Sequence, residues 1–422
     1  MSLVEAIRRS DIPAVQRQLD AGMAPNANDE SGRLPLCEAA SRNQLETAAL
    51  LLRYGADANA QQHDERRPLT EAAFRGSEEM VTLLLAHGAD SNASGPAGGS
   101  ALLWAVCADA LKVVHQLLQA GCHVDAPSAE GRSPLLQAAS SRWPRALAIA
   151  QLLIQYGADV NHADHFGRTA LMNSAASGQV PMARLLLASG ASPSARTNRG
   201  ETAVVLACRA YQEHPEMIPL LAQYGASLNV RDQYGTEMLT LAASHGHAAA
   251  VEALLQFGCP VDGAPGTLLT PLQAAAREGR SAVVDILITH GADLDRQGDG
   301  GSESPLLESL LKHDNEIAKR LIEAGADVRQ GGMSGAPPLH YALGRFDDWV
   351  YERSRPPKVN RSLIELLLEK GADPSEPLGL SPTALDLARK TRNTQLIGLI
   401  KAYLRRSKGL EATTSVLPPS YQ

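Results

Sequence analysis

The stretch Gly167–Ala195, GRTALMNSAASGQVPMARLLLASGASPSA, is one copy of a pattern that recurs along the chain. A turn leads to Thr169, small residues precede Gly178, and an apolar run, Leu185-Leu186-Leu187, precedes Gly190. Each of these features has a local structural meaning, so the stretch predicts more than a composition does.

Two other stretches, Arg67–Gly88 and Thr270–Gly291, carry the same skeleton. In all three copies the later glycine lies 21 residues after the first position of the opening triplet. Because self-similarity at a fixed period is the signature of a repeat architecture, it takes precedence over other interpretations of the chain.

Each copy predicts a helical hairpin followed by an exposed finger loop. A Thr or Ser before Pro caps the first helix, and the mid-repeat Gly ends it in a left-handed conformation. The Leu triplet gives the second helix an apolar face. The Asp-, Asn- and Gly-rich residues that follow form a turn. One hairpin cannot bury both of its faces, so neighbouring hairpins must stack.

This pattern resembles the ankyrin repeat, whose signature is Gly-x-Thr-Pro-Leu-His-x-Ala-Ala, then Gly, then Val-x-Leu-Leu-Leu, then Gly-Ala-Asp-x-Asn. Leu83-Leu84-Leu85 and the run Gly88–Asn92 match it closely. The resemblance extends over roughly residues 1–404. It implies an all-α solenoid of helix-turn-helix units with β-hairpin-like finger loops.

Twelve repeats are predicted, of which the first and the last are caps with a solvated outer face. The predicted parts are an N-terminal capping repeat (1–28), ten repeats (29–375), a C-terminal capping repeat (376–404) and a basic, then disordered, tail (405–422). Short insertions around Arg142-Trp143-Pro144 and Tyr211–Pro215 are predicted to lie between paired helices, away from the fingers.

The eleventh repeat carries a longer insert, about 345–360, that contains Phe346, Trp349 and Tyr351. One interpretation is a solvated loop that closes over its own repeat. The other is a loop that contacts a partner, because aromatic residues are favoured anchors at interfaces.

Composition and charge exclude several classes of protein. The net charge is −7, which disfavours nucleic acid as a partner of the whole surface. No apolar run approaches the roughly 20 residues of a membrane span, and the first residues lack the apolar core of a signal peptide. Five scattered cysteines without a C-x-x-C pair indicate buried residues in a reducing compartment. We expect a cytoplasmic protein, with the nucleus as an alternative, or the host cell if it is a secreted effector.

No catalytic, cofactor or metal motif is present in the sequence. It contains no H-E-x-x-H, phosphate-binding loop or G-x-S-x-G elbow, and no span is left over for a catalytic domain. We therefore expect a protein that is not an enzyme and binds no cofactor, metal or small-molecule substrate. His340 lies near the start of a first helix, where we expect a structural hydrogen bond.

In ankyrin arrays the partner usually lies against the finger tips and the inner face of the first helices, and we carry this over by analogy. The matching positions are Arg66, Phe74, Trp104, Arg132, His165, Phe166, Arg168, Arg199, Glu201, Gln233 and Tyr234. Phe166 and Tyr234 occupy tips and are the favoured anchors. For Phe74 and Trp104 a packing role stays open. The fingers of the ninth and tenth repeats look nearly featureless.

The C-terminal region adds two weaker signals. Residues 389–408 hold seven basic side chains and no acidic one, which fits either the polar face of a cap or a nuclear-import or anionic-surface patch. The tail contains Pro418, Pro419 and Tyr421 in a PPxY pattern, which resembles a ligand for WW domains.

The leading functional hypothesis is a non-catalytic scaffold that binds one or more proteins on the concave surface. A second is a ubiquitin-ligase adaptor whose PPxY tail recruits a WW-domain ligase. A third is an enzyme inhibitor or a secreted effector that acts on another protein. An enzyme whose active site the sequence does not reveal is the least favoured hypothesis.

Overall fold

The computed structural model describes residues 2–210, 212–299, 301–333, 335–344, 359–375, 383–390 and 393–407. These residues belong to two compact units, Met1–Ser227 and Leu228–Gln422. The described part of the chain is helical and contains no strand, only three isolated antiparallel bridges in finger loops. The all-α fold predicted from the repeats is confirmed.

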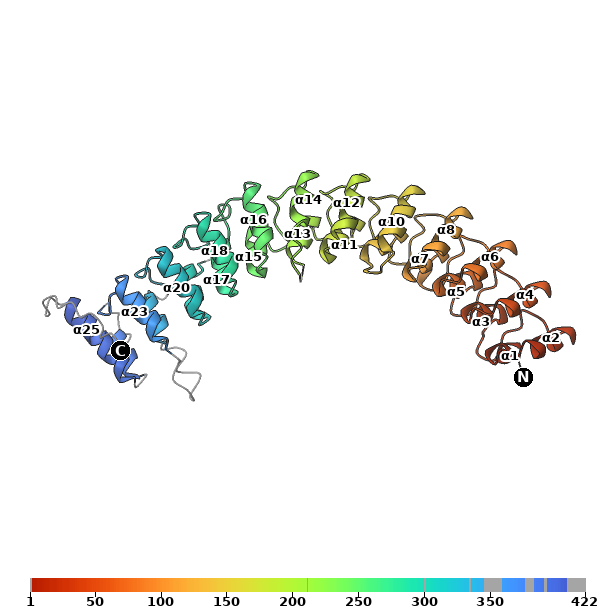
Figure 1. Cartoon of the computed structure of the whole chain (residues 1–422), viewed down its shortest axis with the longest axis horizontal. Coiled ribbons are helices and arrows are strands. Elements are labelled where there is room, and N and C mark those ends of the chain that lie inside the picture. Colours follow the sequence, from red (N-terminus) through yellow and green to blue (C-terminus); the bar gives the residue numbers. More distant parts are fainter. Residues whose placement is uncertain are drawn as a thin grey trace, which may run out of the picture. The chain divides into compact units, whose positions relative to one another are not determined.

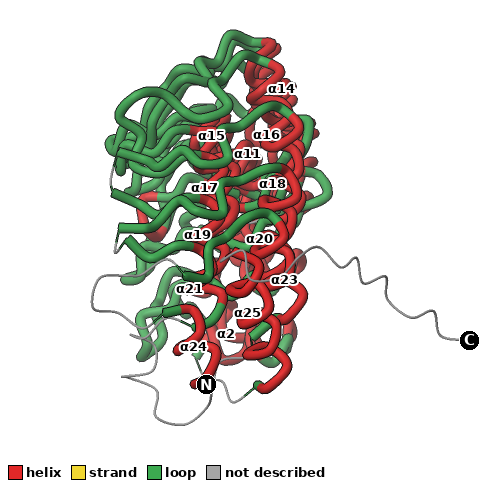
Figure 2. Tube along the Cα trace, turned by 90° about the vertical axis from the view of Figure 1, so that its left-hand side faces the viewer, coloured by secondary structure: helices red, strands yellow, loops and turns green. Residues whose placement is uncertain are grey.

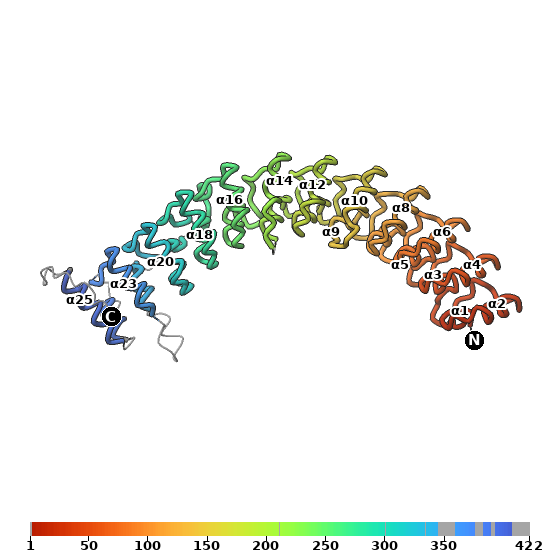
Figure 3. The backbone as a smooth tube through the Cα atoms, in the orientation of Figure 1, coloured from red at the N-terminus to blue at the C-terminus, as the bar shows by residue number. Residues whose placement is uncertain are grey.

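Unit 1 consists of seven successive helix pairs, and most of these helices are labelled in Figure 1. They are α1 (Leu3–Arg8), α2 (Ile12–Asp20), α3 (Pro35–Ser41), α4 (Leu45–Arg53), α5 (Pro68–Arg75), α6 (Glu78–Ala86), α7 (Ala101–Cys107), α8 (Leu111–Gln119), α9 (Pro134–Ser140), α10 (Ala146–Gln155), α11 (Ala170–Ser177), α12 (Val180–Ala188), α13 (Ala203–Cys208) and α14 (Met217–Gln223), with a short 3-10 turn η1 (Pro96–Gly98) before α7. In Figure 3 the second helices of this unit, which are the even-numbered ones from α4 to α14, form one row beside the first helices.

Unit 2 continues the same pattern. Its described helices are α15 (Met238–His245), α16 (Ala248–Gln256), α17 (Pro271–Arg277), α18 (Ser281–Thr289), α19 (Pro305–Leu311), α20 (Asn315–Ala324), α21 (Pro338–Ala342), α23 (Arg361–Glu369), α24 (Ala384–Lys390) and α25 (Thr394–Ser407). Figure 2 shows that the first helices α17 and α19 lie nearer to the finger loops than the second helices α18 and α20. The two helices of each pair therefore form separate layers.

The hairpins of each unit stack in chain order. In unit 1, α5 packs between α3 and α7, and α6 packs between α4 and α8; in unit 2, α17 packs between α15 and α19. Leucines of successive first helices, such as Leu102 and Leu135, are fully buried, as are Leu84 and Leu117 of second helices. Burying one leucine side chain contributes about 1.5–3 kcal/mol, so these rows of leucines hold the stack together.

Local capping explains where the first helices begin. Thr270 accepts a hydrogen bond from the backbone N–H of Gln273, and the Gln273 side chain accepts one from the backbone N–H of Thr270. Ser133 and Thr169 cap α9 and α11 in the same way through their hydroxyl groups. These polar side chains satisfy N–H groups that the first turn of a helix leaves free.

Both short insertions lie between the helices of a pair, as predicted. Arg142-Trp143-Pro144 separates α9 from α10, and Trp143 is 58% exposed. The second insertion separates α13 from α14. Its His214 ring lies against Gly178, the residue that ends α11 with a φ of 71°. The insertion of the seventh repeat therefore covers the end of a helix in the sixth.

Of two predictions about the C-terminal part, one can be compared with the structure and the other cannot. The last helix, α25, ends at Ser407, three residues beyond the predicted end of the capping repeat, and its last turn carries Arg405 and Arg406. Basic side chains in the last turn of a helix interact favourably with its dipole. The other prediction concerns Phe346, Trp349 and Tyr351, and these residues lie outside the described part of the chain.

The expected hydrogen bond of His340 is absent from the described structure. Its ring is 1% exposed, and neither ring nitrogen has a hydrogen-bond partner among the described residues. The residues at this position in earlier repeats, Thr240 and Gln273, donate to the carbonyl oxygen just before the next first-helix cap. For His340 that residue is Pro382, which lies outside the described residues.

Unit 2 is expected to lose stability as the pH falls below neutral, because burial lowers the pKa of His340. At mildly acidic pH the imidazole of His340 binds a proton in the unfolded chain but not in the folded one. The stability of the folded state is therefore full above the pKa of the unfolded histidine, about 6.5, and declines below it. Urea unfolding at neutral and at mildly acidic pH should show a smaller loss for His340→Phe than for the wild type. The same pH dependence in both proteins would contradict this account.

The described cysteines are all free, and they are buried or half-buried. Burial raises the pKa of the Cys107 thiol, although Arg132 lowers it in part, and burial raises the pKa of Cys122 to about 11. Such thiols are poor nucleophiles at neutral pH. No helix among the described residues is both long enough and apolar enough to cross a membrane.

Candidate functional site

The finger loops of the fourth to seventh repeats are joined by backbone hydrogen bonds. The N–H of Ala129 donates to the carbonyl of Ala97, that of His165 to Glu130, and that of Asn198 to Phe166. The Asn198 side chain adds a bond to the carbonyl of His165. Because each finger is tied to the next, the side chains at their tips project from a fixed backbone.

The fingers of the sixth and seventh repeats are also braced from inside, each by a buried polar side chain. One carboxylate oxygen of Asp164, a residue that is 6% exposed, accepts hydrogen bonds from the N–H groups of Phe166 and Arg168, both 2.9 Å long. In the next finger the Thr197 hydroxyl accepts from Arg199 and Glu201. Side chains that bond their own backbone two residues on are typical of tight turns.

Three fingers enclose a hollow of about 300 Å³. It is lined by Arg132 of the fifth repeat, Asp164, Phe166 and Arg168 of the sixth, and Thr197, Asn198, Arg199 and Glu201 of the seventh. The hollow, here named the finger pocket, thus gathers five of the residues predicted to bind a partner: Arg132, Phe166, Arg168, Arg199 and Glu201.

The predicted residues of the finger pocket differ in how available they are. Phe166 is 59% exposed, as expected of a tip residue. Glu201 is only 5% exposed and forms an ion pair with Arg209, the residue that follows α13. Arg132 pairs with Glu130, with 3.1 Å between Nε and Oε2. Glu201 therefore lies at the base of the pocket, and the aromatic ring lies at its surface.

His165 is exposed beside the pocket, and its ring lies near Gly131 of the preceding finger. Further along unit 1, Arg66 is held by ion pairs to Asp64 and Glu71. The rings of Phe74 and Trp104 meet edge to face with centroids 5.6 Å apart. Phe74 and Trp104 therefore pack against each other between the third and fourth repeats, while Phe74 stays 51% exposed.

The remaining predicted contacts fall elsewhere. Gln233 and Tyr234 belong to unit 2, where both are exposed and the Tyr234 side chain is 72% accessible. Pro418, Pro419 and Tyr421 lie outside the described residues.

Sequence reasoning missed two groups of residues. Asp164, Thr197 and Asn198 line the pocket, but their hydrogen bonds depend on how one finger meets the next. In unit 2, Leu268 of the ninth finger is 64% exposed and Met333 of the eleventh is 75% exposed. The ninth finger is therefore less featureless than its glycines suggested.

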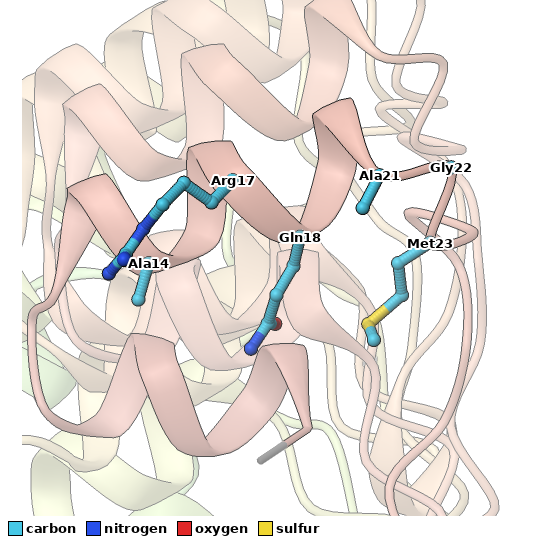
Figure 4. Close-up of a pocket in the computed structure, with 6 residues that line it drawn as sticks. All are labelled: Ala14, Arg17, Gln18, Ala21, Gly22 and Met23. Atoms are coloured by element: carbon cyan, nitrogen blue, oxygen red, sulfur yellow. The ribbon is translucent and has the colours of Figure 1, made fainter.

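Another hollow, of about 450 Å³, lies at the end of α2 and is drawn in Figure 4. Arg17 and Met23 lie at opposite ends of it, with Gln18 between them. All of its lining residues in the described part of the chain come from α2 and the turn that follows, so no other described repeat contributes a side chain. The finger pocket, built by three repeats, is the better candidate for specific recognition.

Within the described residues, no group of three or more His, Cys, Asp or Glu side chains is arranged to hold a metal ion. The carboxylates of the finger pocket are engaged by Arg209 and by backbone N–H groups. The finger pocket is therefore suited to contacting a side chain on the surface of another molecule.

Comparison with known proteins agrees with this architecture. A family model described as "Ankyrin repeats (3 copies)" matches residues 3–95, 93–164, 145–232 and 210–298, which together extend from residue 3 to residue 298. This chain belongs to the ankyrin-repeat family. Among solved structures, it is similar to the ankyrin repeat domain of Bcl-3, described as a unique member of the IkappaB protein family. The two are 27% identical with a TM-score of 0.46, over 53% of this chain and 98% of that one.

Ankyrin repeats are in general protein–protein interaction modules, so family membership supports a scaffold that binds other proteins. Such solenoids present one extended surface built from the same position of each repeat. In this ankyrin-repeat chain the finger pocket is a place on that surface where three repeats bring several unlike side chains together.

Proposed function

We propose that this protein is a non-catalytic scaffold that binds a partner protein at the finger pocket of unit 1. The observation that carries the proposal is the meeting of an exposed aromatic ring, Phe166, with the arginines of three successive repeats in one hollow. Aromatic residues and arginine are the side chains that most often dominate the energetics of protein interfaces.

The rigid backbone of the fingers supports the same function. Hydrogen bonds between Glu130 and His165 and between Phe166 and Asn198 hold the tips before any partner arrives. A surface that is ordered in advance loses less conformational entropy on binding, so more of the contact energy appears as affinity.

Replacing Phe166 by Ala is expected to weaken partner capture by about 30-fold or more, the range of an interface hot spot of 2 kcal/mol. The experiment compares affinity capture and quantitative mass spectrometry for the wild type, Phe166→Ala, and the double variant with Tyr234→Ala. Trp143→Ala is the matched control, because Trp143 is 58% exposed and Phe166 is 59% exposed.

The far-ultraviolet circular dichroism of all variants should match the wild type, since all three rings are exposed. Capture that survives Phe166→Ala unchanged, or that falls equally with Trp143→Ala, would remove the finger pocket as the binding site.

A second proposal rests on the tail, where Pro418-Pro419-Ser420-Tyr421 forms a PPxY pattern. In this proposal the repeats hold a substrate and the tail recruits a WW-domain ubiquitin ligase. Tyr421→Ala should abolish binding to a purified WW domain, whereas Ser420→Ala should not, because the third position of the pattern is unspecified. Equal binding of wild type and Tyr421→Ala in a calorimetric titration would eliminate the adaptor role.

A further inference from the structure

The charges of the finger pocket do not balance. Its carboxylates are all committed: Asp164 accepts two backbone N–H groups, and Glu201 pairs with Arg209. Glu130, at the border of the pocket, pairs with Arg132. None of these acidic groups remains to receive a cation from a ligand.

Two guanidinium groups are left over. Arg168 and Arg199 are exposed, and neither side chain has a hydrogen-bond or ion-pair partner among the described residues. Arg168 lies two residues after Phe166 on the sixth finger, and Arg199 comes from the seventh finger on the same hollow. The pocket therefore offers two unpaired, positively charged hydrogen-bond donors together with an exposed aromatic ring.

From these observations we propose that the finger pocket recognises a short peptide segment in which an anionic side chain lies next to an apolar one. Here an arginine can form paired hydrogen bonds to a carboxylate or a phosphate, both of which match the planar guanidinium. The apolar neighbour packs on Phe166. This inference rests on the proposed function, since it specifies the partner of the same site.

The size of the pocket limits the ligand. A hollow of about 300 Å³ lies at the lower end of the range for ligand sites, so it accommodates one or two side chains and not a folded domain. Nucleic acid is the less favoured anion, because strong binding to a phosphate backbone needs many basic contacts and this site offers two free ones. The net charge of −7 acts in the same direction.

The test uses short fluorescein-labelled peptides in a Gly-Ser background and fluorescence polarisation with the full chain. The central residues are Glu-Leu-Glu, phosphoserine-Leu-phosphoserine, Gln-Leu-Gln, Glu-Gly-Glu or Lys-Leu-Lys. We expect the first two peptides to bind. The tighter binder of the two shows whether the natural anion is a carboxylate or a phosphate. The Gln peptide should bind about 10-fold more weakly or worse, since a hydrogen bond to a charged group is being replaced. Added salt should weaken the charged peptides.

Variants assign the effect to the two arginines. Arg168→Ala with Arg199→Ala should weaken the Glu-Leu-Glu peptide about 10-fold or more per guanidinium. Arg53→Ala is the matched control, because Arg53 is an exposed arginine of unit 1 that does not line the pocket and has no hydrogen-bond or ion-pair partner among the described residues. The charge-reversed pair, Arg168→Glu with Arg199→Glu, should prefer the Lys-Leu-Lys peptide.

Three results would overturn the inference: no binding by any peptide, equal binding of the Glu and Gln peptides, or equal affinity of the wild type and the double Ala variant. Stronger, arginine-dependent binding of a single-stranded oligonucleotide would overturn it in favour of nucleic acid. If partner capture still depends on Phe166 but not on Arg168 or Arg199, only this inference fails. If capture is independent of Phe166, the proposed function itself fails.

Discussion

Gly178→Ala is expected to destabilise unit 1 by about 2–5 kcal/mol. Gly178 ends α11 in the left-handed region, with a φ of 71°, where a side chain adds strain of about 1–2 kcal/mol. A Cβ placed there would overlap the His214 ring, so the ring of the insertion must also move. Overpacking of this kind adds about 1–3 kcal/mol.

Gly190→Ala is the matched control for this substitution. Gly190 has a φ of 93°, but no heavy atom lies within 4 Å of the Cβ position, so only the backbone strain applies. Urea unfolding followed by circular dichroism, with hydrogen exchange of α11, should rank the two variants. The double change Gly178→Ala and His214→Ala should recover the packing part of the loss. Equal losses for Gly178→Ala and Gly190→Ala would show that His214 does not cover the helix end.

The second large effect is expected at Gln273 in unit 2, a fully buried side chain. Its Oε1 accepts from the N–H of Thr270 at 2.7 Å, and its Nε2 donates to the carbonyl of Glu303 at 2.6 Å and to the Ser302 hydroxyl at 2.9 Å. Gln273→Leu keeps the volume but leaves two buried backbone groups without partners, which costs about 2–6 kcal/mol in total.

Gln256→Leu is the control, because Gln256 is exposed at the end of α16 and its replacement should change stability by less than about 0.5 kcal/mol. Urea midpoints of the two variants and the hydrogen exchange rate of the Thr270 amide measure the difference. If Gln273→Leu is as stable as the control, this side chain does not join the ninth repeat to the tenth.

The sequence predicted the elements whose causes are local. The hydroxyl of Thr169, the mid-repeat Gly178 and the apolar run Leu185–Leu187 each determine the beginning, end or buried face of one helix, and the structure has α11 and α12 where they indicate. A constant period also implies that equivalent finger positions recur from repeat to repeat, so the sequence predicts contact residues on all three fingers that form the pocket.

What the sequence could not predict depends on the partner that each polar group finds in another repeat. Glu201 and Arg168 look equally available in the sequence, but Arg209, the residue that follows α13, pairs with Glu201, whereas Arg168 has no ion-pair partner among the described residues. His340 matches a signature position, but whether its ring finds an acceptor depends on the next repeat. The exposure of Leu268 likewise depends on how neighbouring fingers stack.

The most direct measurement is site-specific photo-crosslinking in cells with a benzoylphenylalanine introduced in place of Phe166, and in a separate protein in place of Trp143. The two positions are almost equally exposed, but only the first lines the finger pocket. Our account predicts a covalent adduct with a partner protein from position 166 and none from position 143. An adduct from position 143 with none from position 166 would contradict it.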